Sequence, residues 1–173
     1  MGAALFVIRR IRPEEWPAYR DIRLAALRDS PDSFGSTYEA EVARPDELWS
    51  SRVLAASTSG MDLALLAEED GAACGLAWCK ISSSEPGLAD VFQMWVAPGS
   101  RGRGVGRALL GEIAAWARGA GVRTLRLGVT VADSPAMRLY RSFGFRPEGP
   151  TEPLREGSTL MAQTLVLALA FSS

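Results

Sequence analysis

The chain has 173 residues, of which 47% are hydrophobic and 23% are charged. This composition is typical of a globular protein, and we expect residues 1–173 to form a single domain. The 19 basic and 20 acidic residues give a net charge of −1, which favours neither nucleic acid nor a membrane as a partner. The sequence has no histidine, which excludes a Ser-His-Asp triad and imidazole zinc sites, and we expect no metal.

Residues 5–11 form an apolar run rich in β-branched side chains, which predicts a first strand. Pro13 stands at a position suited to the first turn of a helix. The apolar residues after it recur at helical spacing, and Pro31 disfavours helical backbone angles at Ser30. We therefore expect a helix that begins near Pro13 and ends before Ser30.

The stretch from Asp32 to Val42 has no clean hydrophobic period, so it predicts neither a helix nor a strand. Pro45 favours a second, short helix in which Leu48 and Trp49 pack inward. Ser57–Gly60 consists of small and polar residues and predicts a loop.

Two strands are predicted over Asp62–Glu68 and Ala72–Ile81, because Glu69-Asp70-Gly71 between them is a hairpin signal. Cys74 and Cys79 are the only cysteines. Residues five apart on one strand point to opposite faces, so we expect two separate, reduced thiols. Reduced thiols indicate a cytoplasmic protein.

The second half of the chain alternates strands with helices. We expect strands over Ala89–Val96, Val122–Val129 and Leu160–Ala170. One helix follows a glycine-rich loop and ends at Gly119–Gly121, and another begins at Ser134-Pro135 and ends at Gly144. Hairpin and crossover connections together predict a mixed sheet.

The glycine-rich loop has the sequence RGRGVG at residues 101–106 and leads directly into a helix. Glycines let successive main-chain N–H groups converge, and the first helical turn adds unpaired N–H donors and partial positive charge. Such a loop suits a phosphate or pyrophosphate, with Arg101, Arg103 and Arg107 adding charge at its rim. It lacks the Gly-Lys-Ser/Thr ending of a Walker loop and the spacing of a dinucleotide fingerprint. A tight turn that binds nothing remains the alternative.

Two segments resemble signature motifs of the GNAT superfamily of N-acetyltransferases. VAPGSRGRGVGRALL resembles the acetyl-CoA motif Gln/Arg-x-x-Gly-x-Gly/Ala, and DSPAMRLYRSFGFRPEG resembles the motif Asn-x-x-Ala-x-x-Leu-Tyr followed by Gly-Phe. Asp133 stands where the second motif has Asn. The matching residues are Arg101, Gly104 and Gly106 in the first motif, and Ala136, Leu139, Tyr140, Gly144 and Phe145 in the second.

The resemblance implies an α/β fold with a central mixed, mostly antiparallel twisted sheet. Helices would cover both faces, and a splayed strand pair would form the cofactor site. It implies acetyl-CoA as the cofactor, with loop amides on the pyrophosphate and a strand edge on the pantetheine arm. The residues assigned to the cofactor by this resemblance are Trp95, Val96, Arg101, Gly102, Arg103, Gly104, Val105, Gly106, Arg107, Asp133 and Ala136.

The implied reaction is direct attack of a primary amine on the thioester in a ternary complex. Tyr140 matches the tyrosine often assigned as general acid, although its helical spacing alone also fits a core aromatic. Asp90 is the candidate base, with a solvated residue at a strand start as the equal alternative. An alkyl ammonium is mostly protonated at neutral pH, so the reaction needs a route for that proton.

The segment from Phe34 to Glu41 corresponds to the part of the family that covers the acceptor. We assign Phe34, Tyr38, Glu39 and Glu41 as candidate substrate-binding residues, because aromatic and acidic side chains suit a cationic amine. An ordinary charged loop is the alternative. The run Arg23–Glu41 resembles a recurring pattern in a bacterial branch of the family.

The expected partner is a small-molecule or peptide amine, and a homodimer is an expectation from the family. Two other functions remain open at this stage. A sensor or regulatory module would keep the acyl-CoA site without turnover. A nucleotide-binding protein unrelated to CoA would use the same loop for a different phosphate.

Overall fold

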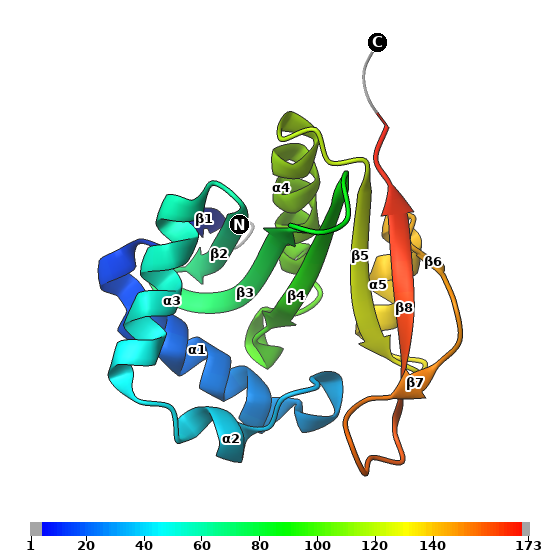
Figure 1. Ribbon diagram of the computed structural model, residues 1–173. Coiled ribbons are helices and arrows are strands. Elements are labelled where there is room, and N and C mark those ends of the chain that lie inside the picture. The colour runs from blue at the N-terminus through cyan, green and yellow to red at the C-terminus, as the bar shows by residue number, and fades with distance from the viewer. Residues whose placement is uncertain (1–4, 171–173) are drawn as a thin grey trace.

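The apolar runs of the chain assemble into one mixed sheet in the computed structural model, which describes residues 5–170 (Figure 1). Its strands are β1 (Phe6–Arg10), β2 (Asp62–Glu69), β3 (Ala72–Ile81), β4 (Leu88–Val96), β5 (Thr124–Thr130), β6 (Arg146–Pro147), β7 (Glu152–Pro153) and β8 (Met161–Ala168). Its α-helices are α1 (Trp16–Asp29), α2 (Tyr38–Val42), α3 (Asp46–Ser59), α4 (Val105–Gly119) and α5 (Pro135–Phe143). Short 3-10 turns cover Pro13–Glu15, Pro31–Ser33 and Pro98–Ser100.

The strand order is β1-β2-β3-β4-β5-β8-β6, and β7 also pairs with β8. Every pairing among the described strands is antiparallel except that of β4 with β5. Helices α1 and α3 bury one apolar cluster against one face, and α4 and α5 bury a second cluster against the other face. The predicted mixed, mostly antiparallel sheet with helices on both faces is therefore confirmed.

The hairpin predicted between β2 and β3 forms, and its turn has the backbone angles that its sequence favours. Asp70 and Gly71 both have positive φ angles, 52° and 78°, as a two-residue hairpin turn with left-handed central residues requires. The helices predicted near Pro13 and from Ser134 also form. The Ser134 hydroxyl caps α5 by accepting a hydrogen bond from the Met137 N–H at 3.1 Å.

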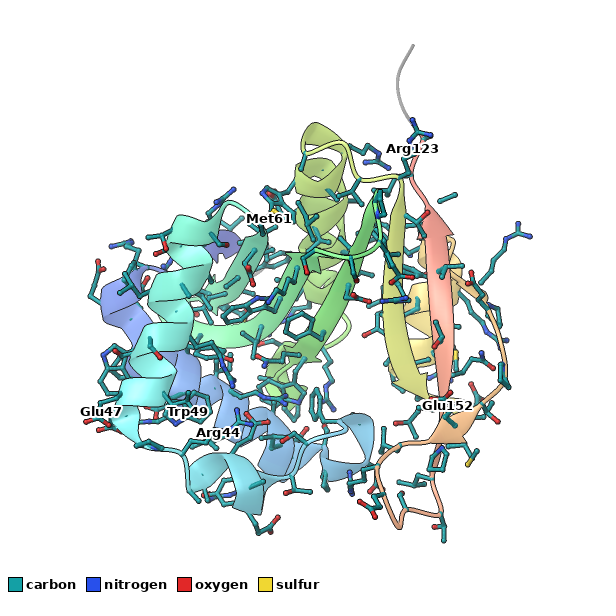
Figure 2. All side chains as sticks on the ribbon, viewed as in Figure 1. Arg44, Glu47, Trp49, Met61, Arg123 and Glu152 are labelled. Carbon is teal, nitrogen blue, oxygen red and sulfur yellow. The ribbon has the colours of Figure 1, made fainter. Side chains whose placement is uncertain are left out.

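Three local predictions in the first third of the chain are wrong. A helix, α2, forms in the stretch that shows no period, because five residues are too few to display one. Helix α3 continues to Ser59, so Ser57–Gly60 is mostly helical and not a loop. Trp49 is buried as predicted (Figure 2), but Leu48 is 42% exposed.

The expectation that Cys74 and Cys79 face opposite sides is also wrong. The register of β2 with β3 shifts between Ala67 and Glu68, which leaves Cys74 as an extra residue in β3. This bulge reverses the alternation, and both thiols lie in the cluster beneath α4. Both are free and buried.

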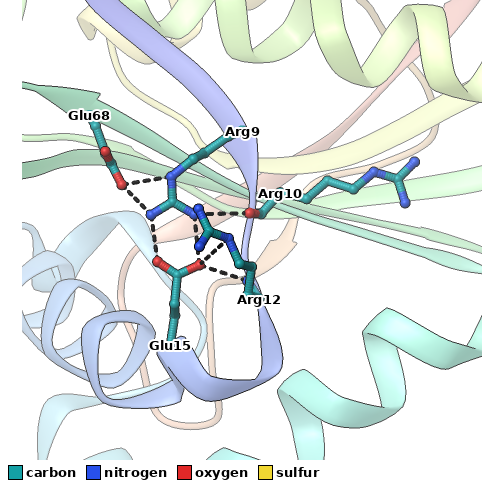
Figure 3. Close-up of polar contacts among 5 residues, drawn as sticks. All are labelled: Arg9, Arg10, Arg12, Glu15 and Glu68. Atoms are coloured by element: carbon teal, nitrogen blue, oxygen red, sulfur yellow. Dashed lines mark hydrogen bonds and ion pairs between the residues drawn. The ribbon is translucent and has the colours of Figure 1, made fainter. Parts of the chain in front are cut away.

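A network of hydrogen bonds and ion pairs connects edge strand β1 to β2 and to the turn before α1 (Figure 3). The Arg9 guanidinium donates to Glu68 on β2 and to Glu15 in the turn before α1, with Nε to Glu68 Oε1 at 2.7 Å and Nη1 to Glu15 Oε1 at 2.7 Å. The Arg12 N–H donates to the same Glu15 oxygen at 2.9 Å. The hydrogen bond from Arg9 is the main reason that the pKa of Glu15 falls from 4.5 to about 2.

We predict that Glu15→Gln lowers the free energy of unfolding by about 1.5–3 kcal/mol at pH 7, the usual value for a hydrogen bond to a charged group. Because the folded-state pKa of Glu15 is depressed, its contribution is complete above pH 4.5 and is lost as the pH falls through about 2. Urea titrations at several pH values measure this difference. Glu14→Gln, which removes an exposed neighbouring acid, is the control. A pH-independent difference for Glu15→Gln would contradict the account.

Candidate active site

Strands β4 and β5 touch only at one end and then separate (Figure 1). Their parallel register covers three pairs, from Leu88 with Thr124 to Asp90 with Arg126. Beyond Asp90 each strand continues for six or four more residues, to Val96 and to Thr130, without pairing to the other. The remainder of β4 therefore presents an unpaired backbone edge to the gap, as the sequence resemblance implied.

A bulge in β4 lies along this open edge. Trp78 of β3 pairs with Phe92, whereas Leu76 pairs with Trp95, so Gln93 and Met94 together face a single residue of β3. Gln93 has a φ of 55°, which is uncommon for a residue other than glycine. Its side-chain oxygen accepts a hydrogen bond from the Tyr19 hydroxyl at 2.8 Å, which fixes the distorted residue to α1. No sequence pattern marked Gln93.

The loop after β4 exposes a row of main-chain donors. Within residues 5–170, no acceptor takes a hydrogen bond from the N–H groups of Gly102 to Arg107. Gly102 and Gly104 have φ angles of 79° and 87°, which glycine adopts without strain, and an added Cβ at either position meets open space. Gly104 is also the N-cap of α4, so the positive end of that helix faces the same region.

The three loop arginines make contacts within the protein. Arg101 donates to the Val96 carbonyl at 2.9 Å and to Asp29 at 2.9 Å, and Asp29 also accepts from the Trp95 indole at 3.2 Å. Asp29 is thus a connection between α1 and the loop that sequence reasoning missed. Arg103 pairs with Glu69, and Arg107 donates to Ser142 at 2.7 Å. These contacts hold the loop while its amides stay free.

The two signature segments, far apart in sequence, meet at Gly106. A Cβ built on Gly106 would lie 2.7 Å from Leu139 Cδ2 and 3.5 Å from Met94 Cε. The absence of a side chain at Gly106 therefore lets α4, α5 and β4 approach one another. Asp133 and Ala136, the other candidates in the second segment, are exposed, and Asp133 forms an ion pair with Arg138 at 2.7 Å.

Tyr140 follows Leu139 on α5 and packs edge-on against Phe145, with ring centroids 5.9 Å apart. The ring is buried, and burial raises the pKa of the phenol to about 12. No residue in the described part of the chain forms a hydrogen bond with its hydroxyl, and that oxygen is not among the fully enclosed unpaired atoms. The phenol is therefore a neutral donor that is free to bind another molecule.

Asp90 lies at the closed end of the strand pair. Both of its oxygens accept from Arg126, Oδ1 from Nε at 2.7 Å and Oδ2 from Nη2 at 3.2 Å. Six residues separate it from Val96, which is about 20 Å along a strand. This placement suits a structural contact between β4 and β5 better than the role of a base next to the loop.

The two acids among the predicted acceptor-binding residues differ, because Glu41 is paired with arginines and Glu39 is exposed. Glu41 is buried and accepts from Arg23 at 2.7 Å, and Arg44 lies 3.6 Å away (Figure 2 labels Arg44). Burial opposes ionisation of Glu41, but the Arg23 pair outweighs it and keeps the pKa below its ordinary value. Glu39 is exposed, Phe34 lies under the Arg23 guanidinium, and Tyr38 pairs with Arg28. Of these two acids, Glu39 alone is exposed to solvent.

Cys74 lies close to the loop that follows β4. Its carbonyl accepts from the Ala97 N–H at 2.8 Å, one turn before the glycines. The thiol is buried, and this burial raises its pKa above the ordinary value; burial raises that of Cys79 to about 12. Both thiols are therefore poor nucleophiles.

Comparison with known proteins agrees with this geometry. Residues 9–145 match the model of the Acetyltransferase (GNAT) family. Among curated relatives, a mycothiol acetyltransferase of Acidothermus cellulolyticus is 30% identical over 166 residues, covering 88% of this chain and 48% of that protein. An aminoglycoside N(6')-acetyltransferase type 1 of Stenotrophomonas maltophilia is 31% identical over 151 residues, covering 84% of this chain and 89% of that protein.

The chain spans about half the length of the mycothiol acetyltransferases that it matches first. Among solved structures, yncA of Salmonella typhimurium, determined with its cofactor acetyl-CoA, has a TM-score of 0.79 at 20% identity. The match covers 98% of this chain and 96% of that one. At 20% sequence identity, this structural similarity is evidence for the fold alone.

We predict that neither thiol of the native protein reacts with Ellman's reagent at pH 8, because both are buried and both pKa values are raised. Guanidinium denaturation should release two reactive thiols per chain. Absorbance of the released nitrothiobenzoate gives the number of reactive thiols per chain in the native and in the denatured protein. One rapidly reacting thiol in the native protein would contradict this expectation and would favour a reaction through an acetyl-cysteine.

Proposed function

The chain belongs to the GNAT family of acetyltransferases, and we propose that it transfers an acetyl group from acetyl-CoA to a primary amine. The observation that carries this proposal is the row of unpaired amides from Gly102 to Arg107 at the open end of the β4–β5 splay. Those amides and the positive end of α4 suit the CoA pyrophosphate. The edge of β4 around Trp95 and Val96, which β5 leaves unpaired and where Arg101 donates to the Val96 carbonyl, suits the amide groups of the pantetheine arm.

The reaction requires no covalent enzyme intermediate. The amine nitrogen attacks the thioester carbonyl, the N–C bond forms, and the C–S bond breaks. The ammonium form of the acceptor loses two protons in all, one to solvent and one that ends on the CoA thiol. Main-chain amides along the β4 edge would stabilise the oxyanion of the tetrahedral intermediate.

Tyr140 would assist departure of the CoA thiolate. Its pKa of about 12 lies well above the value of about 8.5 for an alkyl thiol, so complete proton transfer to the thiolate is unfavourable. The phenol therefore acts mainly as a hydrogen-bond donor to the developing charge, and solvent supplies the final proton. A donor held in a desolvated site is more effective than the same group in water.

Deprotonation of the amine would proceed through solvent. The base role predicted for Asp90 remains a proposal that the Arg126 pair does not support. Two carboxylates lie near Gln93 among the described residues: Glu41 is paired with Arg23, and Asp62 accepts from the Trp78 indole at 2.9 Å.

We also propose a cytoplasmic setting, which two unpaired cysteines support. Among the residues that the structure describes, no helix combines the length and apolarity needed to cross a bilayer. The curated relatives named above act on small molecules, whereas two solved structures of similar fold are ribosomal-protein acetyltransferases, so the acceptor is a small-molecule or peptide amine. A homodimer remains a prediction from the family.

The test is release of free CoA thiol from acetyl-CoA in the presence of a panel of primary amines. We predict amine-dependent release and about a 100-fold lower kcat in Tyr140→Phe, the usual scale for loss of an acid-base group. The KM for acetyl-CoA should change little, because the hydroxyl interacts with charge that develops only in the transition state.

The control is the free energy of unfolding of Tyr140→Phe. It should equal that of the unmodified chain, because the hydroxyl has no hydrogen-bond partner among residues 5–170. An unchanged kcat would refute the role of Tyr140. Tight CoA binding without thiol release for any amine would refute the transferase and leave the sensor alternative.

A further inference from the structure

A cavity of about 350 Å³ lies on the sheet face that α1 and α3 cover, next to the bulge in β4. Phe92 and Gln93 line it, so the cavity adjoins the same strand whose edge is proposed to bind the pantetheine arm. Its volume is at the small end of the range for ligand sites. The lining residues are Arg23, Ser36, Glu41, Arg44, Arg52, Asp62, Trp78, Lys80, Phe92 and Gln93.

Positive charge exceeds negative charge in this lining. Four cationic side chains stand against the two carboxylates of Glu41 and Asp62. Glu41 is already paired with Arg23, and Asp62 accepts from the Trp78 indole at 2.9 Å. In the described part of the chain, neither Arg52 nor Lys80 has a carboxylate within 4.0 Å of its cationic nitrogens.

Arg23 supplies a second, independent indication. Its side chain is 5% exposed, and Nε and Nη2 donate to the two oxygens of Glu41 at 3.3 and 2.7 Å. The third nitrogen, Nη1, is the one fully buried side-chain nitrogen or oxygen in residues 5–170 without a hydrogen-bond partner. A buried charged donor without an acceptor bears its desolvation penalty uncompensated, so an oxygen that reached Nη1 would remove this penalty.

The cavity also offers an apolar wall. Trp78 and Phe92 stack across β3 and β4 with ring centroids 6.1 Å apart. An acceptor with one anionic end and an apolar body would satisfy both parts of the lining while its amine points to the bulge at Gln93.

We propose that this cavity is the acceptor subsite and that it selects primary amines bearing a carboxylate, which Arg23, Arg52 and Lys80 bind. The inference rests on the proposed acetyl transfer for the identity of the acceptor, but the anion preference of the cavity is measurable by binding alone.

The kinetic test compares phenylalanine with phenylalaninamide as acceptors. These two differ in charge but hardly in size. We expect the ratio of kcat/KM, carboxylate over carboxamide, to fall at least 10-fold in the double variant Lys80→Gln/Arg52→Gln. Comparing this ratio between proteins cancels the different basicity of the two amines. Arg118→Gln, which removes an exposed charge on α4, is the matched control and should keep the ratio of the unmodified chain.

The binding test uses N-acetylphenylalanine and its carboxamide, and it needs no turnover. We expect the carboxylate to raise the melting temperature of the native protein, the carboxamide to have a smaller effect, and the double variant to lose the difference. This pattern without any thiol release would support the anion subsite while refuting the proposed transferase.

Equal stabilisation by the carboxylate and the carboxamide would overturn the inference, as would a kinetic ratio that the double variant leaves unchanged. Inorganic phosphate at the same concentration is the third arm. If it stabilises the protein as much as N-acetylphenylalanine does, the cavity is a general oxyanion site and its assignment to carboxylate-bearing amines is wrong.

Discussion

The short parallel contact between β4 and β5 is the constraint on which the rest of the site depends. Three residue pairs join the two halves of the sheet, and the bidentate pair of Asp90 with Arg126 closes the last of them. Without further pairing, the right-handed twist of each half separates the strands, and the backbone edge of β4 stays open. The residue first assigned as a base is therefore better understood as the contact at the apex of the opening.

Main-chain groups, rather than charged side chains, define the proposed cofactor site. The arginines of the loop bind Glu69, Asp29 and Ser142, so their contribution is to hold the loop in shape. The amides from Gly102 to Arg107 remain available, and two of the glycines adopt left-handed angles, which allow successive N–H groups to converge on an anion. Preorganised neutral donors bind a diphosphate without bringing in flexible charged side chains that must be ordered.

Much of the fold and of the loop was predictable from sequence, because those features rest on local rules. The hairpin at Asp70-Gly71, the cap at Ser134 and the glycine loop each depend on a few adjacent residues. The features that escaped prediction depend on distant pairings. The bulge at Gln93 and the Arg23–Glu41 pair arise from packing between elements, so no short pattern reports them, and with them the charge of the acceptor cavity was missed.

The most direct test of the account is a calorimetric titration of CoA into Gly104→Ala with Gly60→Ala as its control. Both glycines have left-handed φ angles, 87° and 70°, and an added Cβ meets no atom within 4 Å at either position, so the two variants carry similar backbone strain. We predict at least a 10-fold rise in Kd for Gly104→Ala alone. Equal CoA affinity in both variants, or no heat with the unmodified chain, would contradict a diphosphate site built from these amides.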